Sequence, residues 1–515
     1  MKKYLIAGMT ALILLTGSLS YADNKYTSVE EMIRDQKIIR VLLDEAPGFG
    51  NQAATINMMN RVRQMQFQGT FELIYPDGAQ YLIEKVISLF NLPKELPPVY
   101  NYEDNQHRKI TFIAESVFIK RRMHNEVDAL TLGITGAHDA GDQEACKVIQ
   151  GCKPYADNFA IFTNTQVFVE IQPWFQSPGL DTIDLRDENV RRPIEPYGKF
   201  LVYPVSSFAD AKQYLTDDPA GQELSRTNPA LKVLIDGIEN NYFNLLPVYG
   251  FTFLKLYNDE DQDAVLYPQN IMQVITAGRY AQTHGNAEMQ KPLIIPVFYN
   301  YTEEVNEIGA LLQQENWGDY EAQGGKAMRA AINTLGLKQP NAFLTASLSD
   351  NDASKKIQSL RPGQILLLSM GSLPKVVFDG IYSDVRSNIW PPFREGEGSL
   401  SMLIMKGQPH FRCTNYLRVS GNEESYKWEP YFDLVKDVAL KTRLQDLYGK
   451  SGLCAARIWV TNPVIYQTIA EFIIESKDAG SSFANYFADL QTEAFKPEND
   501  RIYRGLEEAL KVIIK

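Results

Sequence analysis

The chain is 515 residues long, with 44% hydrophobic and 22% charged residues. This is the composition of an ordinary globular protein, and it gives no sign of disorder or of a repeat array. One hydrophobic core stops growing at about 250–300 residues, so two or three domains are expected. Acidic residues outnumber basic ones by 63 to 51, a formal charge of -12. Such a charge argues against nucleic-acid partners and favours small or neutral ones.

The first 22 residues have the pattern of a bacterial secretory signal peptide. Lys2 and Lys3 precede an apolar segment from Tyr4 to about Leu19, and Ser20-Tyr21-Ala22 forms a small-x-small cleavage site. The apolar run is shorter than the roughly 20 residues that a spanning helix needs, so an uncleaved anchor is the less favoured alternative. We expect residues 1–22 to be removed and the mature chain to be periplasmic or secreted, with no stable membrane span.

Four cysteines and five histidines offer little for metal binding. Cys146 and Cys152 are close enough in sequence to form a small-loop disulfide in an oxidising compartment. No CxxC pair or His-rich cluster is present, so no structural zinc site is expected. The acidic run 258–263 has a DxD spacing, but it lacks the glycine and distal glutamate of a calcium loop, and a solvated loop is favoured. The sequence therefore predicts no metal ion.

Short apolar runs alternate with helix-like segments, which is typical of parallel sheets covered by helices on both faces. In the first half the expected strands, with helices such as 53–65 between them, are 38–43, 71–75, 110–113 and 130–135. In the second half they are 292–299, 342–346, 365–369, 389–393 and 410–413. Helical patterns at 464–476 and 500–514 end the chain.

The two series predict an α/β protein of two halves with a cleft between them. We expect an N-terminal domain over 23–285 and a C-terminal domain over 286–465. Residues 466–515 are expected to form helices that pack back across the domains.

Two glycine-rich turns follow expected strands, at the edge where open α/β sheets bind ligands. The first is the loop Gly48-Phe49-Gly50-Asn51-Gln52, in which the glycines allow close backbone approach and the amides can bond sugar hydroxyls. The second is the turn Ser369-Met370-Gly371-Ser372, before a helix expected to begin near Pro374, since proline suits a first helical turn.

The most informative segment is the turn Arg394-Glu395-Gly396-Glu397-Gly398-Ser399. It is expected to feed a helix over 400–405, with Ser399 as N-cap, and a helix N-terminus attracts anions. Arg394 adds a fixed cation, while an ordinary capped helix without a ligand is the structural alternative. We expect this turn and the 369–372 turn to lie side by side, so that a diphosphate bridges them.

The motifs resemble those of glycosyltransferases of the GT-B type, and this resemblance implies two facing Rossmann-like domains. The pattern RxGxxS followed by GxP, here Arg394, Gly396, Ser399, Gly407 and Pro409, is similar to the donor-site segment of the peptidoglycan-precursor N-acetylglucosaminyltransferase family. That family has a glutamate on the helix that holds the ribose hydroxyls, where this chain has Met402; Glu395 or Glu397 could substitute.

Two further segments add to the resemblance. Phe49 to Gln52 (FGNQ) is similar to the N-terminal loop of GT-B fucosyltransferases, and Leu367 to Ser372 (LLSMGS) looks like a glycine strand end of GT-B donor domains. The resemblance implies a nucleotide-sugar donor, held mainly by the C-terminal domain, and an acceptor that is a glycan, lipid or protein. It implies no cofactor beyond that substrate. The implied donor-site residues are Ser369, Gly371, Ser372, Arg394, Glu395, Gly396, Glu397, Gly398 and Ser399.

An inverting transfer needs a base for the acceptor hydroxyl and a cationic or dipolar site for the leaving diphosphate. Asp44 and Glu45 end the first strand, while His138 and Asp139 follow the strand 130–135. Asp139 or His138 is the preferred base. A turn-capping carboxylate or a packed histidine is the structural alternative for each, and a retaining transfer would need no such base.

An exported two-lobed solute-binding protein for a sugar or an anionic small molecule is the alternative function. It also holds its ligand between α/β lobes, and it fits the export signal directly. Nucleotide sugars are cytosolic, so an exported transferase would act in a host cell or use a donor presented elsewhere. A serine hydrolase is a weaker alternative, because Leu367 replaces the first glycine of a GxSxG elbow around Ser369.

Overall fold

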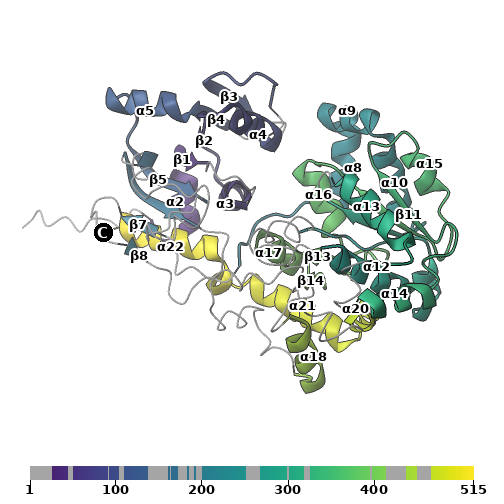
Figure 1. The fold of residues 1–515 in the computed structure, drawn as a ribbon. Helices are drawn as coiled ribbons and strands as arrows, with labels where there is room; N and C mark the ends of the chain where they lie inside the picture. The colour runs from purple at the N-terminus through teal and green to yellow at the C-terminus, as the bar shows by residue number, and fades with distance from the viewer. Residues whose placement is uncertain are drawn as a thin grey trace, which may run out of the picture.

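The computed structural model describes residues 26–43, 50–90, 92–103, 109–136, 161–162, 164–171, 182–184, 191–192, 200–250, 267–298, 301–317, 325–394, 397–412, 436–448 and 465–514. They form an α/β protein with two Rossmann-like parts, each built on its own largely parallel sheet (Figure 1). The predicted fold class is confirmed. No helix among these residues is both long enough and apolar enough to cross a bilayer.

The first sheet has the strand order β3-β4-β2-β1-β5-β6-β7-β8. Its five parallel strands are β1 (Ile38–Leu42), β2 (Thr70–Tyr75), β4 (Lys109–Ala114), β5 (Leu130–Thr135) and β6 (Thr165–Glu170). The antiparallel strands lie at its two sides: β3 (Val99–Glu103), β7 (Thr182–Asp184) and β8 (Arg191–Arg192). Its helices are α2 (Val29–Asp35), α3 (Gly50–Gln64), α4 (Gln80–Phe90) and α5 (Glu115–Met123).

The second sheet contains β11 (Phe343–Ser347), β12 (Ile365–Ser369), β10 (Leu293–Val297) and β9 (Asn244–Leu245), in that spatial order. Parallel bridges from Leu245 to Ile389 and from Val248 to Phe393 add β13 (Phe393–Arg394), and β13 pairs with β14 (Phe411–Arg412). Every residue of β12 is buried, as expected for an apolar strand covered on both faces.

Helices on the second sheet come from most of the chain after residue 200. They are α8 (Phe208–Asp217), α9 (Pro219–Thr227), α10 (Pro229–Glu239), α12 (Tyr267–His284), η2 (Ala287–Gln290), α13 (Thr302–Gln313), α14 (Gly325–Thr334), α15 (Ala353–Gln358), α16 (Lys375–Tyr382), α17 (Glu397–Met405), α18 (Val438–Tyr448), α20 (Ile465–Glu475) and α21 (Ser482–Ala494). Helix α8 packs on α16, α10 on α15 and α12 on α20.

The change from one sheet to the other falls earlier than the boundary expected at residue 285. Strand β9 pairs with β10, and helices α8, α10 and α12 contact elements of the second sheet. The expected boundary is therefore wrong. The prediction failed because β9 was not recognised. This strand has only two residues and is followed closely by Pro247, so the sequence shows no strand pattern there.

The chain crosses between the sheets twice, and the two crossings pair with each other. The Phe200 N–H donates to the Asn499 carbonyl at 2.9 Å, and the Arg501 N–H donates to the Phe200 carbonyl at 2.9 Å. After η7 (Pro497–Asn499), helix α22 (Arg501–Ile513) packs on β6, β7 and α2 of the first part (Figure 1). The C-terminal helix thus returns to the domain where the chain began.

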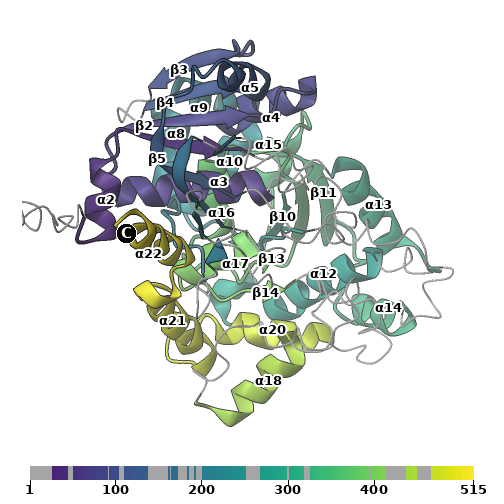
Figure 2. The ribbon, with the colours of Figure 1, turned by 90° about the vertical axis from the view of Figure 1, so that its left-hand side faces the viewer.

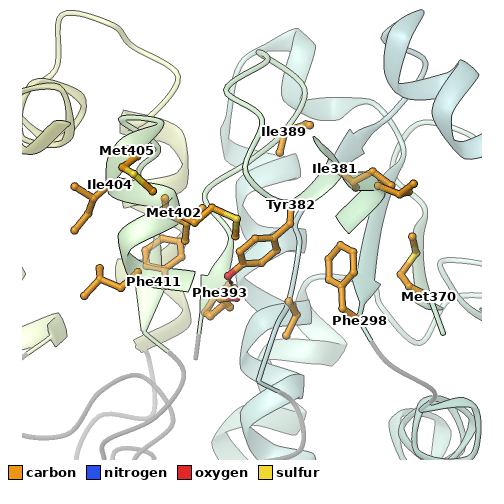
Figure 3. Close-up of a cluster of buried hydrophobic side chains, with 14 of the residues drawn as sticks. Phe298, Met370, Ile381, Tyr382, Ile389, Phe393, Met402, Ile404, Met405 and Phe411 are labelled. Carbon is orange, nitrogen blue, oxygen red and sulfur yellow. Dashed lines mark hydrogen bonds between the residues drawn. The ribbon is translucent and has the colours of Figure 1, made fainter. Parts of the chain in front are cut away.

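The helix after β13 is anchored in the hydrophobic core of the second part, which Figure 3 shows. Met402 on α17 is 3% exposed and lies with Tyr382, Phe393 and Phe411. The Tyr382 hydroxyl donates to the Phe393 carbonyl at 2.9 Å, and the rings of Phe393 and Phe411 have centroids 4.9 Å apart. These contacts fix the position of α17 relative to the end of β13.

Candidate ligand site at the two switch points

In each sheet the strand order reverses beside the first strand. The chain places β2 on one side of β1 and later β5 on the other; in the second sheet β10 and β13 flank β9 in the same way. Such a reversal is a topological switch point, and open α/β sheets bind ligands outside the carboxyl ends of the strands there. The two pairs of strand ends, β1 with β5 and β9 with β13, are thus the candidate ligand sites.

At the first switch point, threonines tie the strand ends to helix α3. Leu42 of β1 is in register with Thr135 of β5, whose hydroxyl donates to the Leu42 carbonyl at 3.1 Å. Thr55 of α3 is fully buried, and its hydroxyl accepts a hydrogen bond from the Gly136 N–H at 2.8 Å. Because α3 bonds the backbone just beyond β5, its N-terminal half lies over this edge of the sheet.

The candidate bases follow these two neighbouring strands. Asp44 and Glu45 come just after β1, and His138 and Asp139 come just after Gly136. All four lie outside the described residues, so their roles stay a prediction. The register of β1 with β5 brings the chain segments that lead to both pairs to one point on the sheet edge.

The loop 48–52 is in part helical. Gly48 and Phe49 lie outside the described residues, while Gly50, Asn51 and Gln52 belong to the first turn of α3. The helix begins three residues before the expected start at 53. Gln52 is 1% exposed, so the prediction that its amide is open to sugar hydroxyls is wrong for this structure.

At the second switch point, α17 is the next helix in the chain after β13. This helix begins at Glu397, so Ser399 is its third residue, and the prediction that Ser399 is the N-cap is wrong. Glu395 and Gly396 lie outside the described residues. Gly398, in the first turn, faces open space, because a Cβ built there would meet no heavy atom within 4 Å. The first turn of α17 therefore has room for at least a methyl group at this position.

Arg394, the fixed cation expected beside the turn, is buried. Its side chain is 2% exposed, and it lies close to His410, which is 1% exposed. Burial lowers the pKa of His410 well below its usual value, and the Arg394 charge lowers it further. His410 is therefore neutral, and its Nδ1 lies 2.9 Å from the Gln408 carbonyl. The positive charge of Arg394 is held at the strand end in a low-dielectric surrounding.

Two parts of the family motif have structural roles. Met402, where the N-acetylglucosaminyltransferase family has its ribose glutamate, is buried in the core, so no ribose contact is available from this position. Gly407 has a φ of +62° and ends α17, with the Gln408 N–H donating to the Leu403 carbonyl at 2.9 Å.

The 369–372 turn lies at the same sheet edge but not beside the 394–399 turn. Strands β10 and β9 separate β12 from β13, which is three strand spacings or about 14 Å. The prediction that one diphosphate bridges both turns is therefore wrong. The Ser369 hydroxyl is buried and accepts from the Tyr301 N–H at 3.0 Å. Gly371, with a φ of +67°, directs the chain into the exposed Ser372.

A lysine at the start of α16 is a functional candidate that the sequence analysis missed. Pro374 occupies the N-cap position and Lys375 is the first helical residue. The Lys375 Nζ lies 2.5 Å from a carboxylate oxygen of buried Asp379 and 5.4 Å from the ring centroid of Tyr203. The signal that could have revealed Lys375 is its position directly after a glycine turn and a proline.

Tyr203 joins elements of both domains. Its hydroxyl donates to the Gly398 carbonyl at 3.0 Å and has a second hydrogen bond with the side chain of Asn57 on α3. Burial raises the pKa of Tyr203 well above its usual value, and the charge of Asp379 adds to this effect, while the bond from Asn57 lowers it. Helix α3 also packs directly on α17 (Figures 1 and 2). The helices that leave the two switch points are thus in contact.

The predictions on metal binding and on the disulfide are not tested by the described residues. The described residues contain no group of three or more His, Cys, Asp or Glu placed to hold a metal ion. The acidic run 258–263 and the pair Cys146 and Cys152 lie outside them.

No protein-family model matches the chain, and no curated protein matches it in sequence. Among solved structures, it is similar to alpha,alpha-trehalose 6-phosphate synthase from Burkholderia multivorans, with 8% identity, a TM-score of 0.34, and coverage of 92% of this chain and 98% of that one. It is also similar to an alpha-glucosyltransferase in complex with UDP and a 13-mer DNA, with 10% identity, a TM-score of 0.29, and coverage of 88% and 99%. The alpha,alpha-trehalose-phosphate synthase (UDP-forming) from Burkholderia vietnamiensis has 9% identity, a TM-score of 0.28, and coverage of 89% and 100%.

Proposed function

We propose that the protein is a glycosyltransferase that moves a sugar from a nucleotide-sugar donor to an acceptor. The observation that carries the proposal is the contact between α3, which begins at the switch point of the first sheet, and α17, which begins at that of the second. A group transfer needs two substrates held against each other, and each switch point offers a binding edge for one of them.

The second domain would hold the donor. The first turn of α17 presents backbone N–H groups and the positive end of the helix dipole, with open space at Gly398. Arg394 adds a fixed charge at the strand end before this turn, and Lys375, which is paired with Asp379, adds a partly exposed ammonium group. These groups would stabilise the leaving diphosphate as its charge develops, so the proposal requires no metal ion and no cofactor.

The first domain would hold the acceptor, whether glycan, lipid or protein. Asp139 or His138, beyond β5, is the proposed base for the acceptor hydroxyl, with Asp44 and Glu45 beyond the adjacent strand as the other candidates. The N-terminal signal sequence leads us to propose that the protein is exported, and that it meets its donor in a host cell or in another compartment that supplies nucleotide sugars.

A thermal-shift screen of the purified protein tests the proposal. It would use nucleoside diphosphates, nucleotide sugars, free sugars and amino acids, because a ligand that binds only the folded state raises the melting temperature. We expect a shift with one nucleoside diphosphate and with its sugar conjugates. A shift with free sugars or other small solutes alone would overturn the proposal in favour of an exported solute-binding protein.

Arg394→Ala tests the donor side of the site. The loss of a charge that acts on a diphosphate should weaken nucleoside-diphosphate binding by about 1.5–3 kcal/mol, measured by titration calorimetry. Arg226→Ala is the control, since Arg226 lies exposed on α9 and pairs only with its neighbour Glu223 among the described residues. If both variants bound the nucleoside diphosphate with the same affinity, Arg394 would not be part of the donor site.

A further inference from the structure

A buried carboxamide lies where the two domains meet. Asn57, on α3, is 3% exposed, and within the described part of the chain its Oδ1 has no hydrogen-bond partner. Native proteins rarely keep a buried acceptor without a donor, because the acceptor has lost its bonds to water. An acceptor of this kind at a candidate ligand site suggests a donor group that arrives with the ligand.

The neighbouring tyrosine fixes which way the Asn57 amide points. The Tyr203 hydroxyl has one proton, and it donates this proton to the Gly398 carbonyl. Tyr203 can therefore only accept from Asn57, so Asn57 must present its NH2 group to the phenol oxygen. This assignment leaves Oδ1 as the free end of the amide, close to the phenol and to the first turn of α17.

The surroundings of this amide are suited to an anion that also carries hydroxyl groups. Gly398 faces open space in the first turn of α17, where the helix dipole favours negative charge. Lys375 Nζ lies 5.4 Å from the Tyr203 ring centroid, where it is paired with Asp379. A phosphate satisfies the N-terminus of α17, whereas only a donor such as a sugar hydroxyl satisfies Asn57.

We propose that Asn57 Oδ1 accepts a hydrogen bond from a hydroxyl of the transferred sugar while the donor diphosphate lies at the first turn of α17. The assignment rests on the proposed function and deepens it, since it gives the first domain a specificity contact to the donor. The bond forms with the sugar and not with the nucleoside diphosphate, so Asn57 makes the intact donor bind more tightly than the product.

The test compares two ligands on matched variants. Dissociation constants are measured by titration calorimetry for a nucleoside diphosphate and for its sugar conjugate, chosen from UDP-glucose, UDP-N-acetylglucosamine, GDP-mannose and GDP-fucose by the thermal shift of the unmodified protein. Asn57→Leu keeps the side-chain size and removes the acceptor. It should weaken binding of the nucleotide sugar about three- to tenfold and leave the nucleoside diphosphate unchanged.

Asn60→Leu is the matched control, because Asn60 lies one turn further along α3 and is partly exposed. It should change neither constant. If Asn57→Leu does not fold, Tyr203→Phe replaces it, since loss of the hydroxyl that orients the amide should also weaken only the nucleotide sugar.

The outcomes separate this inference from the proposed function. An equal loss for both ligands, or no loss for either, would overturn the role of Asn57 and leave a nucleotide-sugar transferase in place. Failure of the unmodified protein to bind any of the four conjugates or their nucleoside diphosphates would overturn the proposed function itself, and this inference with it.

Discussion

The two sheets have the same strand order but different interiors. Counted along the chain within each sheet, both follow the spatial order 3-4-2-1-5-6: β3-β4-β2-β1-β5-β6 in the first and β11-β12-β10-β9-β13-β14 in the second. The third strand is antiparallel to the fourth in the first sheet and parallel to it in the second. The reversal beside the first strand is common to both, and it is this shared feature that places a candidate site on each sheet.

The central strands differ in charge. In the first sheet Arg40 of β1 is fully buried and pairs across the strands with Glu72 of β2, at 2.6 Å. Its guanidinium also donates to the Asp128 carbonyl at 3.1 Å. In the second sheet the equivalent strands β9 and β10 pair Leu245 with Ile294, both fully buried. One topology thus tolerates either an ion pair or an apolar pair at its centre, provided that the buried charge is compensated.

Removal of one member of the buried Arg40–Glu72 ion pair should give the largest loss of stability. Glu72→Ala leaves the Arg40 charge buried without its carboxylate, so we expect unfolding by urea to require about 3–5 kcal/mol less free energy. Glu223→Ala is the control, because the Glu223–Arg226 pair has the same 2.6 Å separation but is exposed, and it should cost about 1 kcal/mol or less.

The double variant Arg40→Met with Glu72→Leu makes the first sheet resemble the second. Replacement of a buried ion pair by apolar residues of similar volume is often neutral or stabilising by about 1–4 kcal/mol. If Glu72→Ala destabilised the protein no more than Glu223→Ala does, the buried Arg40 charge would not need its carboxylate partner. The contrast drawn between the centres of the two sheets would then be contradicted.

The Asp500–Arg61 contact between the domains should make stability depend on pH, with a smaller effect than the loss of Glu72. Asp500 caps α22 by accepting from the Ile502 and Tyr503 N–H groups, and it pairs with Arg61 of α3 at 2.9 Å. Burial raises the pKa of Asp500 to about 6. The folded state therefore takes up a proton near pH 6 that the unfolded state takes up only near pH 4, so stability should rise as the pH falls from 7 to 5, by about 1 kcal/mol from this group.

Asp500→Asn should remove this contribution. The variant is compared with the unmodified protein in urea unfolding at pH 7, 6 and 5, and Asp218→Asn, at the N-cap of α9, is the control for an altered helix cap. The raised pKa of Asp500 would be contradicted if the unmodified protein and Asp500→Asn differed in stability by the same amount at all three pH values.

Substitution of Gly371 and of Gly398, one in each turn of the second sheet, should give the smallest changes in stability. The two changes should differ in direction. Gly371 has a φ of +67°, so Gly371→Ala should cost about 1 kcal/mol although the site has room for a methyl group. Gly398 is helical and also has room, so Gly398→Ala should leave stability unchanged or raise it by up to about 1 kcal/mol. Thermal unfolding measures both.

Gly398→Ala also bears on the site, because its methyl group would occupy the space proposed for the ligand. We expect weaker nucleoside-diphosphate binding in a protein that is no less stable. Unchanged binding in Gly398→Ala would place the ligand elsewhere on the sheet edge.

Most parallel strands could be predicted because burial on both faces demands continuous apolar runs. The segments expected at 38–43, 71–75, 110–113, 130–135 and 365–369 agree closely with β1, β2, β4, β5 and β12. Strand β9 was missed, and the domain boundary with it, because its two-residue ladder is specified by neighbours and not by its own pattern.

The candidate site was predicted only in part. The 394–399 turn lies at a switch point, but the distance to the 369–372 turn depends on the strand order, which puts β10 and β9 between them. The burial of Arg394 and Gln52 likewise depends on what packs against them. Asn57 and Tyr203 carry no motif, and only their contact across the domains identifies them.

By itself, then, the sequence determined the α/β class and the turns that interrupt its strands, because apolar runs, glycines and prolines act through local backbone and burial preferences. The tertiary structure decided which strand ends are neighbours, which charges are buried, and that α3 meets α17 beside Tyr203. These features arise from contacts between residues far apart in the chain, and no local pattern encodes such contacts.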